Sequence, residues 1–155
     1  MTVAVDTNVL LDLHTDDPLH FARSATTLRN AGAEGPLIIG EVVYAELATR
    51  MPQDVLDTFL GDLGIGYEAS PTDALYAAGA TYLRYIASRS AEIQCPNCGA
   101  TFGVACASCG QSISWRQHLV SDFLVGAHAQ ALAGALLTRD RGVFPRFFPG
   151  LSRYD

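Results

Sequence analysis

Four acidic residues, Asp6, Glu46, Asp122 and Asp140, stand where the predicted secondary structure would bring their carboxylates to one place. Asp6 and Asp140 each follow a short apolar run that is typical of a buried β-strand. Because ligands of open parallel sheets bind at the carboxyl ends of the strands, these two acids should lie at the binding edge. Carboxylates that share such an edge could hold Mg²⁺ or Mn²⁺ for the cleavage of phosphodiester bonds.

The other two acids fall on predicted helices. Glu46 lies inside the helix predicted at 41–50, among apolar neighbours, where a carboxylate is costly unless a cation or hydrogen bonds satisfy it. Asp122 lies in the first turns of the helix predicted at 118–134 and also has apolar neighbours. We favour Glu46 over Glu41 as a ligand, because Glu41 falls at the start of its helix, where an exposed acid is ordinary.

Taken alone, each acid has a structural alternative. It could interact with a helix N-terminus or pair with an arginine, and Asp6 and Asp140 could make Asx-type turn hydrogen bonds. Asn8 and Thr138 favour the metal site instead, since each lies two residues from a proposed ligand. At that spacing a polar side chain could orient a carboxylate or a bound water.

Apolar periodicity and turn residues divide the chain into alternating strands and helices. The predicted strands are 2–6, 36–39, 64–68 and 135–138, and the predicted helices are 17–31, 41–50, 52–61, 70–90 and 118–134. Three helices have a predicted buried stripe: Leu19, Ala22, Ala25 and Leu28 in the first, Leu75, Ala78, Tyr82 and Ile86 in the fourth, and Leu119, Phe123, Ala127 and Leu132 in the last. This alternation indicates an α/β sandwich around a parallel sheet.

The length and composition indicate a single domain. A chain of 155 residues, nearly half of them apolar, can bury a sizeable core and leaves room for only a small insertion. We see no basic leader and no apolar run near the ~20 residues that a membrane span needs. We therefore expect a cytoplasmic protein without a membrane partner.

The charge pattern limits how the protein could bind nucleic acid. The formal net charge of −6 argues against a generally basic surface, on which phosphate contacts usually depend. Lysine is absent, so every basic side chain is an arginine, which can contact phosphate in a planar, bidentate way. We expect Arg139 and Arg141, on either side of Asp140, and Arg116 to contact the substrate.

All four cysteines fall in two C-x-x-C pairs, Cys95 with Cys98 and Cys106 with Cys109, each followed by glycine. This pattern predicts a tetrahedral Zn²⁺ site in a small zinc-ribbon insertion at 92–112. Its role would be structural, because four thiolates leave no position for water. Two disulfides, a redox-active pair and four unrelated thiols are the alternatives, but no secretion signal supports the first and a redox motif would not need duplication.

Four stretches of the chain resemble motifs of the PIN-domain nucleases, and among them of the VapC-type toxins of toxin–antitoxin pairs. The matching stretches are 5–11, 45–47, 122–129 and 137–140, and they occur in the right order. The resemblance implies a Rossmann-like α/β/α sandwich, Mg²⁺- or Mn²⁺-dependent ribonuclease activity, frequent dimerisation and often inhibition by an antitoxin. It also implies a set of site residues: Asp6, Glu46, Asp122 and Asp140 as metal ligands, with Asn8 and Thr138 as supporting polar residues.

The resulting hypothesis is an endoribonuclease, the toxin of a toxin–antitoxin pair. The cysteine segment has no counterpart in the minimal VapC-type pattern, so it could contact RNA, bind a partner or staple a long loop. A non-catalytic RNA- or protein-binding PIN domain is one alternative, although the intact set of acids argues against it. A DNA-directed nuclease is another, although the chain is short for the helical arch segments that we would expect there.

Overall fold

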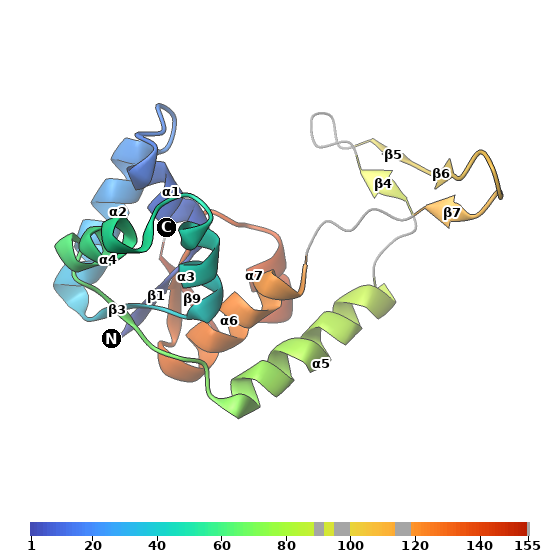
Figure 1. Cartoon of the computed structure of the whole chain (residues 1–155). Helices are drawn as coiled ribbons and strands as arrows, with labels where there is room; N and C mark the ends of the chain where they lie inside the picture. The colour runs from blue at the N-terminus through green and yellow to red at the C-terminus, as the bar shows by residue number, and fades with distance from the viewer. Residues whose placement is uncertain (89–91, 95–99, 114–118, 155) are drawn as a thin grey trace.

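The centre of the molecule is a five-stranded sheet. The computed structural model describes residues 1–88, 92–94, 100–113 and 119–154. The strands of the sheet are β1 (Val3–Val5), β2 (Leu37–Ile39), β3 (Ile65–Tyr67), β8 (Ala135–Leu137) and β9 (Ser152–Tyr154). They pair in the order β3-β2-β1-β8-β9, and every pair is parallel. The expected parallel α/β fold is therefore confirmed (Figure 1).

The register of the sheet brings the ends of the central strands to one edge. Val5 pairs with Leu137, so Asp6 and Thr138 leave β1 and β8 side by side. The backbone N–H of Asp6 donates to Leu137 O at 3.0 Å and extends this pairing. The three residues of each central strand are buried on both faces, as expected for strands covered on both sides.

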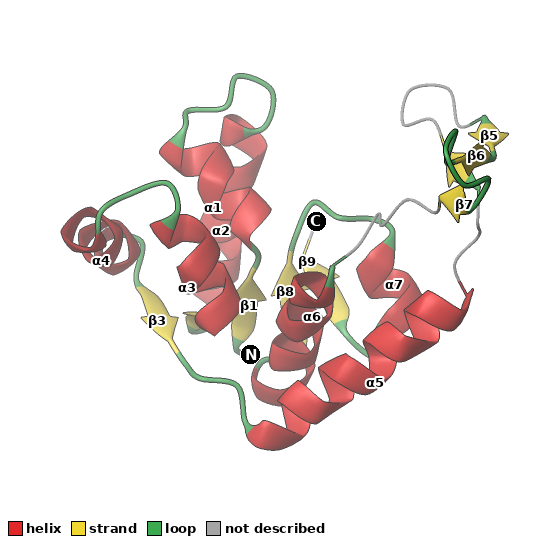
Figure 2. Cartoon of the chain, turned by 45° about the vertical axis from the view of Figure 1, so that its right-hand side comes forward, coloured by secondary structure: helices red, strands yellow, loops and turns green. Residues whose placement is uncertain are grey.

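Seven helices cover the sheet in the part of the chain that the structure describes. They are α1 (Thr7–His14), α2 (Phe21–Glu34), α3 (Glu41–Ala48), α4 (Gln53–Asp62), α5 (Thr72–Ser88), α6 (Val120–Leu132) and α7 (Val143–Phe147). Parallel crossovers are right-handed, so connections that step in opposite directions along the sheet lie on opposite faces. Accordingly, α1, α2 and α4 gather on one side of the molecule and α5, α6 and α7 on the other (Figure 2).

The sequence analysis did not predict α1. This helix begins directly after β1, because Asp6 keeps an extended backbone (φ −84°, ψ 151°) and the next residue is already helical. The first turn of α1 therefore lies at the carboxyl edge of the sheet, beside Asp6. Asn8 and Asp12, four residues apart, lie one turn apart on the same side of this helix.

The helix predicted at 17–31 begins later, at Phe21. The side-chain oxygen Oδ1 of Asp17 accepts the backbone N–H groups of Leu19 and His20 at 2.8 and 2.9 Å, which holds this segment in a turn. Leu19 is 83% exposed and Ala22 is exposed as well, so their places on the buried stripe were wrong. The buried positions of α2 are Ser24, Leu28 and Ala31.

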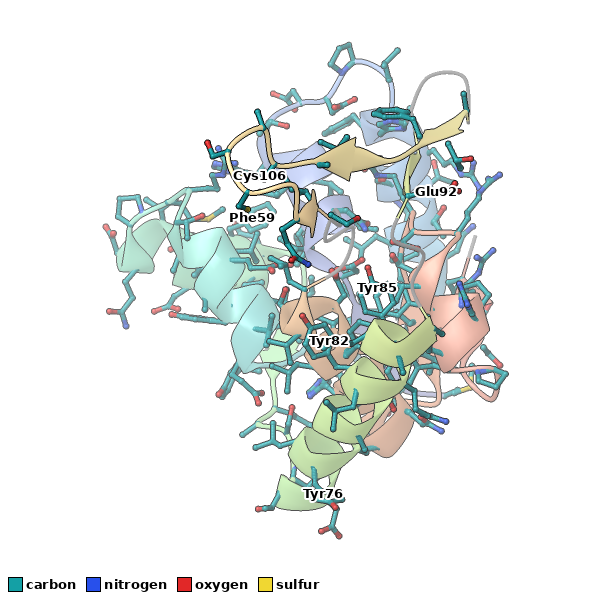
Figure 3. The ribbon with its side chains drawn as sticks, turned by 90° about the vertical axis from the view of Figure 1, so that its right-hand side faces the viewer. Phe59, Tyr76, Tyr82, Tyr85, Glu92 and Cys106 are labelled. Carbon is teal, nitrogen blue, oxygen red and sulfur yellow. The ribbon has the colours of Figure 1, made fainter. Side chains whose placement is uncertain are left out.

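The buried stripe of α5 also differs from the predicted one. Ala78 is buried as predicted, but Leu75 and Ile86 are exposed, and the helix packs along α6 through Ala74, Ala78, Thr81 and Tyr85. Leu119, predicted on the buried stripe of the last helix, is 56% exposed and lies just before α6. Both faces of α5 carry apolar residues, so periodicity alone did not separate the inner face from the outer one. Tyr82 and Tyr85 stack beside Phe123 of α6, with ring centroids 5.4 Å from it, whereas Tyr76 stands near the other end of α5 (Figure 3).

Two short antiparallel hairpins lie between α5 and α6 in the chain. β4 (Ile93–Gln94) pairs with β5 (Thr101–Phe102), and β6 (Val104–Ala105) pairs with β7 (Ser112–Ile113). They stand beyond the far end of α5, apart from the sheet (Figure 1). Among the helices described, none has the length and apolar character needed to cross a bilayer.

Candidate metal centre

Asp6 is the innermost acid at the carboxyl edge of the sheet. Its side chain is buried, and its Oδ2 atom accepts hydrogen bonds from Asn8 Nδ2 and Thr138 Oγ1, both at 2.6 Å. Asn8 Nδ2 also lies 3.2 Å from Thr138 Oγ1, which closes a small network around the carboxylate. The two residues predicted to orient Asp6 therefore do contact it.

Burial, more than any other cause, raises the pKa of Asp6 to about 6. The hydrogen bond from Thr138 opposes this rise, while the negative charges of Glu46 and Asp122 add to it. Glu46 and Asp122 thus lie close enough for their charges to act on Asp6. A buried carboxylate with two acidic neighbours favours the binding of a cation.

Glu46 and Asp122 are both half-buried and are positioned by local hydrogen bonds. The hydroxyl of Thr7, the first residue of α1, donates to Glu46 Oε2. The Oδ2 atom of Asp122 accepts the backbone N–H of Leu119 at 2.9 Å, in the first turn of α6. The sequence analysis overlooked Thr7, which a predicted α1 would have placed beside Asp6.

Asp140 is held differently from the other three acids. Its Oδ1 atom accepts the backbone N–H groups of Gly142 at 2.6 Å and Val143 at 3.0 Å, at the start of α7. These are the Asx-type turn bonds considered above as the structural alternative. Its own N–H donates to Thr138 Oγ1 at 3.0 Å, which keeps Asp140 next to the network around Asp6.

The donor chemistry of the site fits a hard divalent cation. Asp6, Glu46 and Asp122 offer carboxylate oxygens, which Mg²⁺ and Mn²⁺ prefer, and Mg²⁺ usually keeps several waters. Among the described residues, no group of three or more acids, histidines or cysteines lies close enough to hold an ion by direct contact alone. An ion in this site would therefore rely on water ligands as well.

The arginines expected to bind substrate have different surroundings. Arg139 Nε forms an ion pair with Asp12 Oδ2 at 2.8 Å, a partner that the sequence analysis did not foresee. Arg141 is exposed in the loop between β8 and α7. Arg116 lies outside the described residues.

Glu41 and His128 form a separate cluster with Ser70. Glu41 Oε2 accepts the backbone N–H and the hydroxyl of Ser70 at 3.1 and 3.0 Å, and Ser70 Oγ lies 3.2 Å from His128 Nδ1. Burial lowers the pKa of His128, which favours the neutral imidazole. Glu41 is thus half-buried and hydrogen-bonded within this cluster, and is not the exposed acid expected at the start of its helix.

One of the two cysteine pairs is within the described residues. The backbone N–H of Cys106 donates to Gln111 O and that of Gly110 donates to Cys106 O, both at 2.8 Å, and Gly110 has a φ of 72°. Hydrogen bonds from the backbone N–H groups of Cys109 and Ser108 lower the pKa of the Cys106 thiol. This tight turn favours a thiolate at Cys106. Cys95 and Cys98 lie outside the described residues.

Comparison with known proteins identifies the family. The family model described as the PIN domain matches residues 3–147. The chain therefore belongs to the PIN-domain family, whose members are generally nucleases. Comparison with curated proteins gave no match.

A solved structure supports the fold over the whole length of the chain. It is the crystal structure of VapBC2 from Rickettsia felis bound to a DNA fragment from their promoter. The similarity has a TM-score of 0.63 at 15% sequence identity, and it covers 100% of this chain and 100% of the other. At this identity the likeness concerns the fold, and it agrees with the VapC-type resemblance of the motifs.

Proposed function

We propose that this protein is a cytoplasmic, Mg²⁺- or Mn²⁺-dependent endoribonuclease. The proposal rests above all on the placement of Asp6, with its raised pKa, beside the charges of Glu46 and Asp122 at the carboxyl edge of the sheet. Membership of a family of nucleases supports the same reaction class. The RNA specificity follows from the resemblance to VapC-type toxins.

In this proposal each residue around the edge of the sheet has a defined task. Asp6, Glu46 and Asp122 hold the metal, and Asp140 completes the acidic set from the neighbouring loop. Asn8 and Thr138 orient the Asp6 carboxylate through their hydrogen bonds. A bound divalent ion makes water more acidic and stabilises negative charge on phosphoryl oxygens. Arg139, Arg141 and Arg116 would contact the RNA.

RNA cleavage by the purified protein tests this function. Total RNA should be degraded with Mn²⁺ or Mg²⁺ and remain intact with EDTA, and Asp122→Asn should abolish the cleavage. Asp54→Asn is a matched control, because Asp54 is an exposed acid in the first turn of α4 and lies outside the site. Equal cleavage by the wild type and Asp122→Asn would show that the proposed site is not responsible. If single-stranded DNA alone were cleaved, the protein would be a DNA-directed nuclease, and binding without cleavage would indicate a non-catalytic PIN domain.

We further propose that the protein acts as a toxin with an antitoxin partner. The similar solved structure bears the name of a two-component complex, VapBC2, and is bound to a promoter fragment. Co-expression with the product of a small adjacent reading frame should inhibit the cleavage and give a stable complex. A gene neighbourhood without such a frame would favour a stand-alone ribonuclease.

A homodimer is proposed through the outer face of α5. This face is apolar, with Tyr76 81% and Leu83 66% exposed. Such a surface favours self-association, because its burial gains free energy and it carries little charge to repel a copy. Light scattering should give the mass of a dimer, and Leu83→Glu should give a monomer. Leu19→Glu, at a leucine elsewhere that is even more exposed, should leave the dimer intact.

We also propose a structural Zn²⁺ site in the insertion at 92–112. The turn around Cys106 and Cys109 stabilises a thiolate, and Cys95 and Cys98 would supply the other two ligands. The purified protein should contain zinc equimolar with the chain. Cys109→Ser should lose the zinc, whereas Ala107→Ser, in the same turn, should keep it. Retention of full zinc content by Cys109→Ser would rule out this ligand set.

A further inference from the structure

An ion pair between a buried aspartate and a partly exposed arginine lies beside the acidic site. Asp12, on α1, is only 3% exposed, and its Oδ2 atom accepts the hydroxyl of Ser24 at 2.6 Å and Nε of Arg139 at 2.8 Å. A buried carboxylate is costly unless it is paired and hydrogen-bonded, so Asp12 holds the Arg139 side chain firmly in this position.

The backbone of Arg139 is tied to the same helix. Its N–H donates to Asn8 Oδ1 at 3.1 Å, and the Nδ2 atom of Asn8 donates to Asp6 at 2.6 Å. Asn8 and Asp12 are one turn apart on α1, so they hold the backbone and the side chain of Arg139 respectively. Only the side chain of Asn8 therefore separates the backbone of Arg139 from Asp6, the innermost acid of the metal site.

The guanidinium keeps hydrogen-bonding capacity beyond this ion pair. It carries five N–H donors, the bond to Asp12 uses Nε, and the Arg139 side chain is 38% exposed. Arg23, exposed and adjacent to Ser24, lines the same small recess as Arg139. A guanidinium that is already fixed in place loses less entropy when it binds an anion.

We propose that Asp12 is a positioning residue, which presents Arg139 to a phosphate of the RNA strand next to the phosphate that is cleaved. This inference rests on the proposed ribonuclease function and assigns a part of its substrate contact. The exposed carboxylate of Asp17 also interacts with the Arg139 charge, so this surface has no large excess of positive charge. Recognition must then depend on the fixed direction of the Arg139 donors.

The direction in which one substitution changes the RNA affinity distinguishes positioning by Asp12 from simple electrostatics. Asp12→Asn removes a negative charge near the RNA, so long-range electrostatics alone predicts tighter binding. If Asp12 acts by holding Arg139, the same substitution weakens binding instead. Ser24→Ala, which removes the other partner of Asp12 without a charge change, should weaken binding in the same direction and by less.

The experiment measures binding of a short fluorescent single-stranded RNA in the Asp122→Asn background with Mg²⁺, across a range of salt concentrations. Arg139→Met should weaken binding roughly tenfold, as for a lost charge-assisted hydrogen bond. It should also lower the salt slope by about 0.7, as for one lost phosphate contact on a single strand. Asp12→Asn should weaken binding in this background and add nothing to Arg139→Met, since both act through one contact.

Arg29→Met is the matched control for the charge change. Arg29 lies beside Pro36 and Gly64, at the amino ends of β2 and β3. Its substitution therefore removes the same charge from the opposite edge of the sheet. This variant should keep the affinity and the salt slope. Thermal unfolding of each variant shows that it is folded at the assay temperature, and Ser24→Ala serves if Asp12→Asn does not fold.

Two results would overturn the inference. One is unchanged or tighter RNA binding by Asp12→Asn, or by Ser24→Ala in its place. The other is a lower melting temperature of Arg139→Met with unchanged affinity and salt slope, which would make the ion pair purely structural. Cleavage by the otherwise wild-type protein, measured in parallel, tests the ribonuclease function separately. If that protein neither bound nor cleaved RNA, both proposals would fall.

Discussion

Asp6→Asn is expected to reduce RNA cleavage by about a hundredfold or more, because loss of a metal site's supporting partners alone costs about 10- to 100-fold. Asp6 is the deepest of the four proposed site acids, between Asn8 and Thr138 and within reach of the charges of Glu46 and Asp122. The neutral amide removes the charge that attracts the cation but keeps the size of the side chain. Single-turnover cleavage of a defined RNA at saturating Mn²⁺ measures the effect.

The same substitution should stabilise the metal-free protein. Burial of the Asp6 carboxylate raises its pKa to about 6, which means that keeping this carboxylate charged at pH 7 costs free energy. The neutral amide avoids this cost, so we expect a gain of about 1 to 3 kcal/mol in the free energy of unfolding at pH 7 with EDTA. Asp54→Asn, on the exposed surface of α4, should change neither cleavage nor stability. A destabilised Asp6→Asn that still cleaved RNA would contradict both expectations.

The free energy of unfolding of the metal-free protein should also change between pH 7 and pH 5, because Asp6 takes up a proton over this range. Its pKa is about 6 in the folded protein and 3.8 for an unperturbed aspartate, so between these values the folded state binds more protons than the unfolded chain. Stability from this group therefore rises as the pH falls through 6, up to a limit of about 3 kcal/mol near pH 4. Protonation competes with a cation, so metal affinity should fall over the same pH range.

Urea unfolding with EDTA at several pH values measures this dependence. Hydrogen bonds lower the pKa of Asp17, so this group changes the stability at a lower pH and in the opposite direction. The useful quantity is thus the difference between the wild type and Asp6→Asn, which should grow as the pH rises from 5 to 7. Parallel pH profiles for the two proteins would show that Asp6 is not the group responsible.

Much of the fold could be predicted from the sequence because its elements have strong local patterns. The central strands are short apolar runs, and each is followed by a polar residue or a glycine that ends the apolar run, such as Asp6 or Gly40. The predicted strand and helix boundaries mostly lie within a few residues of the observed ones. Helix α1 escaped prediction because eight residues directly after a strand offer little periodicity.

The sequence by itself determined which residues could do chemistry: the acids and polar residues at the strand ends, and the paired cysteines with zinc spacing. These are local properties of residue type and order. Only the tertiary structure decided which of them act on one another. It placed Glu46 and Asp122 near Asp6, gave Asp140 turn bonds to its own loop, and paired Arg139 with Asp12. The physical reason is that burial and charge interaction depend on distances between segments far apart in the chain, and strand and helix periodicity carry no information about them.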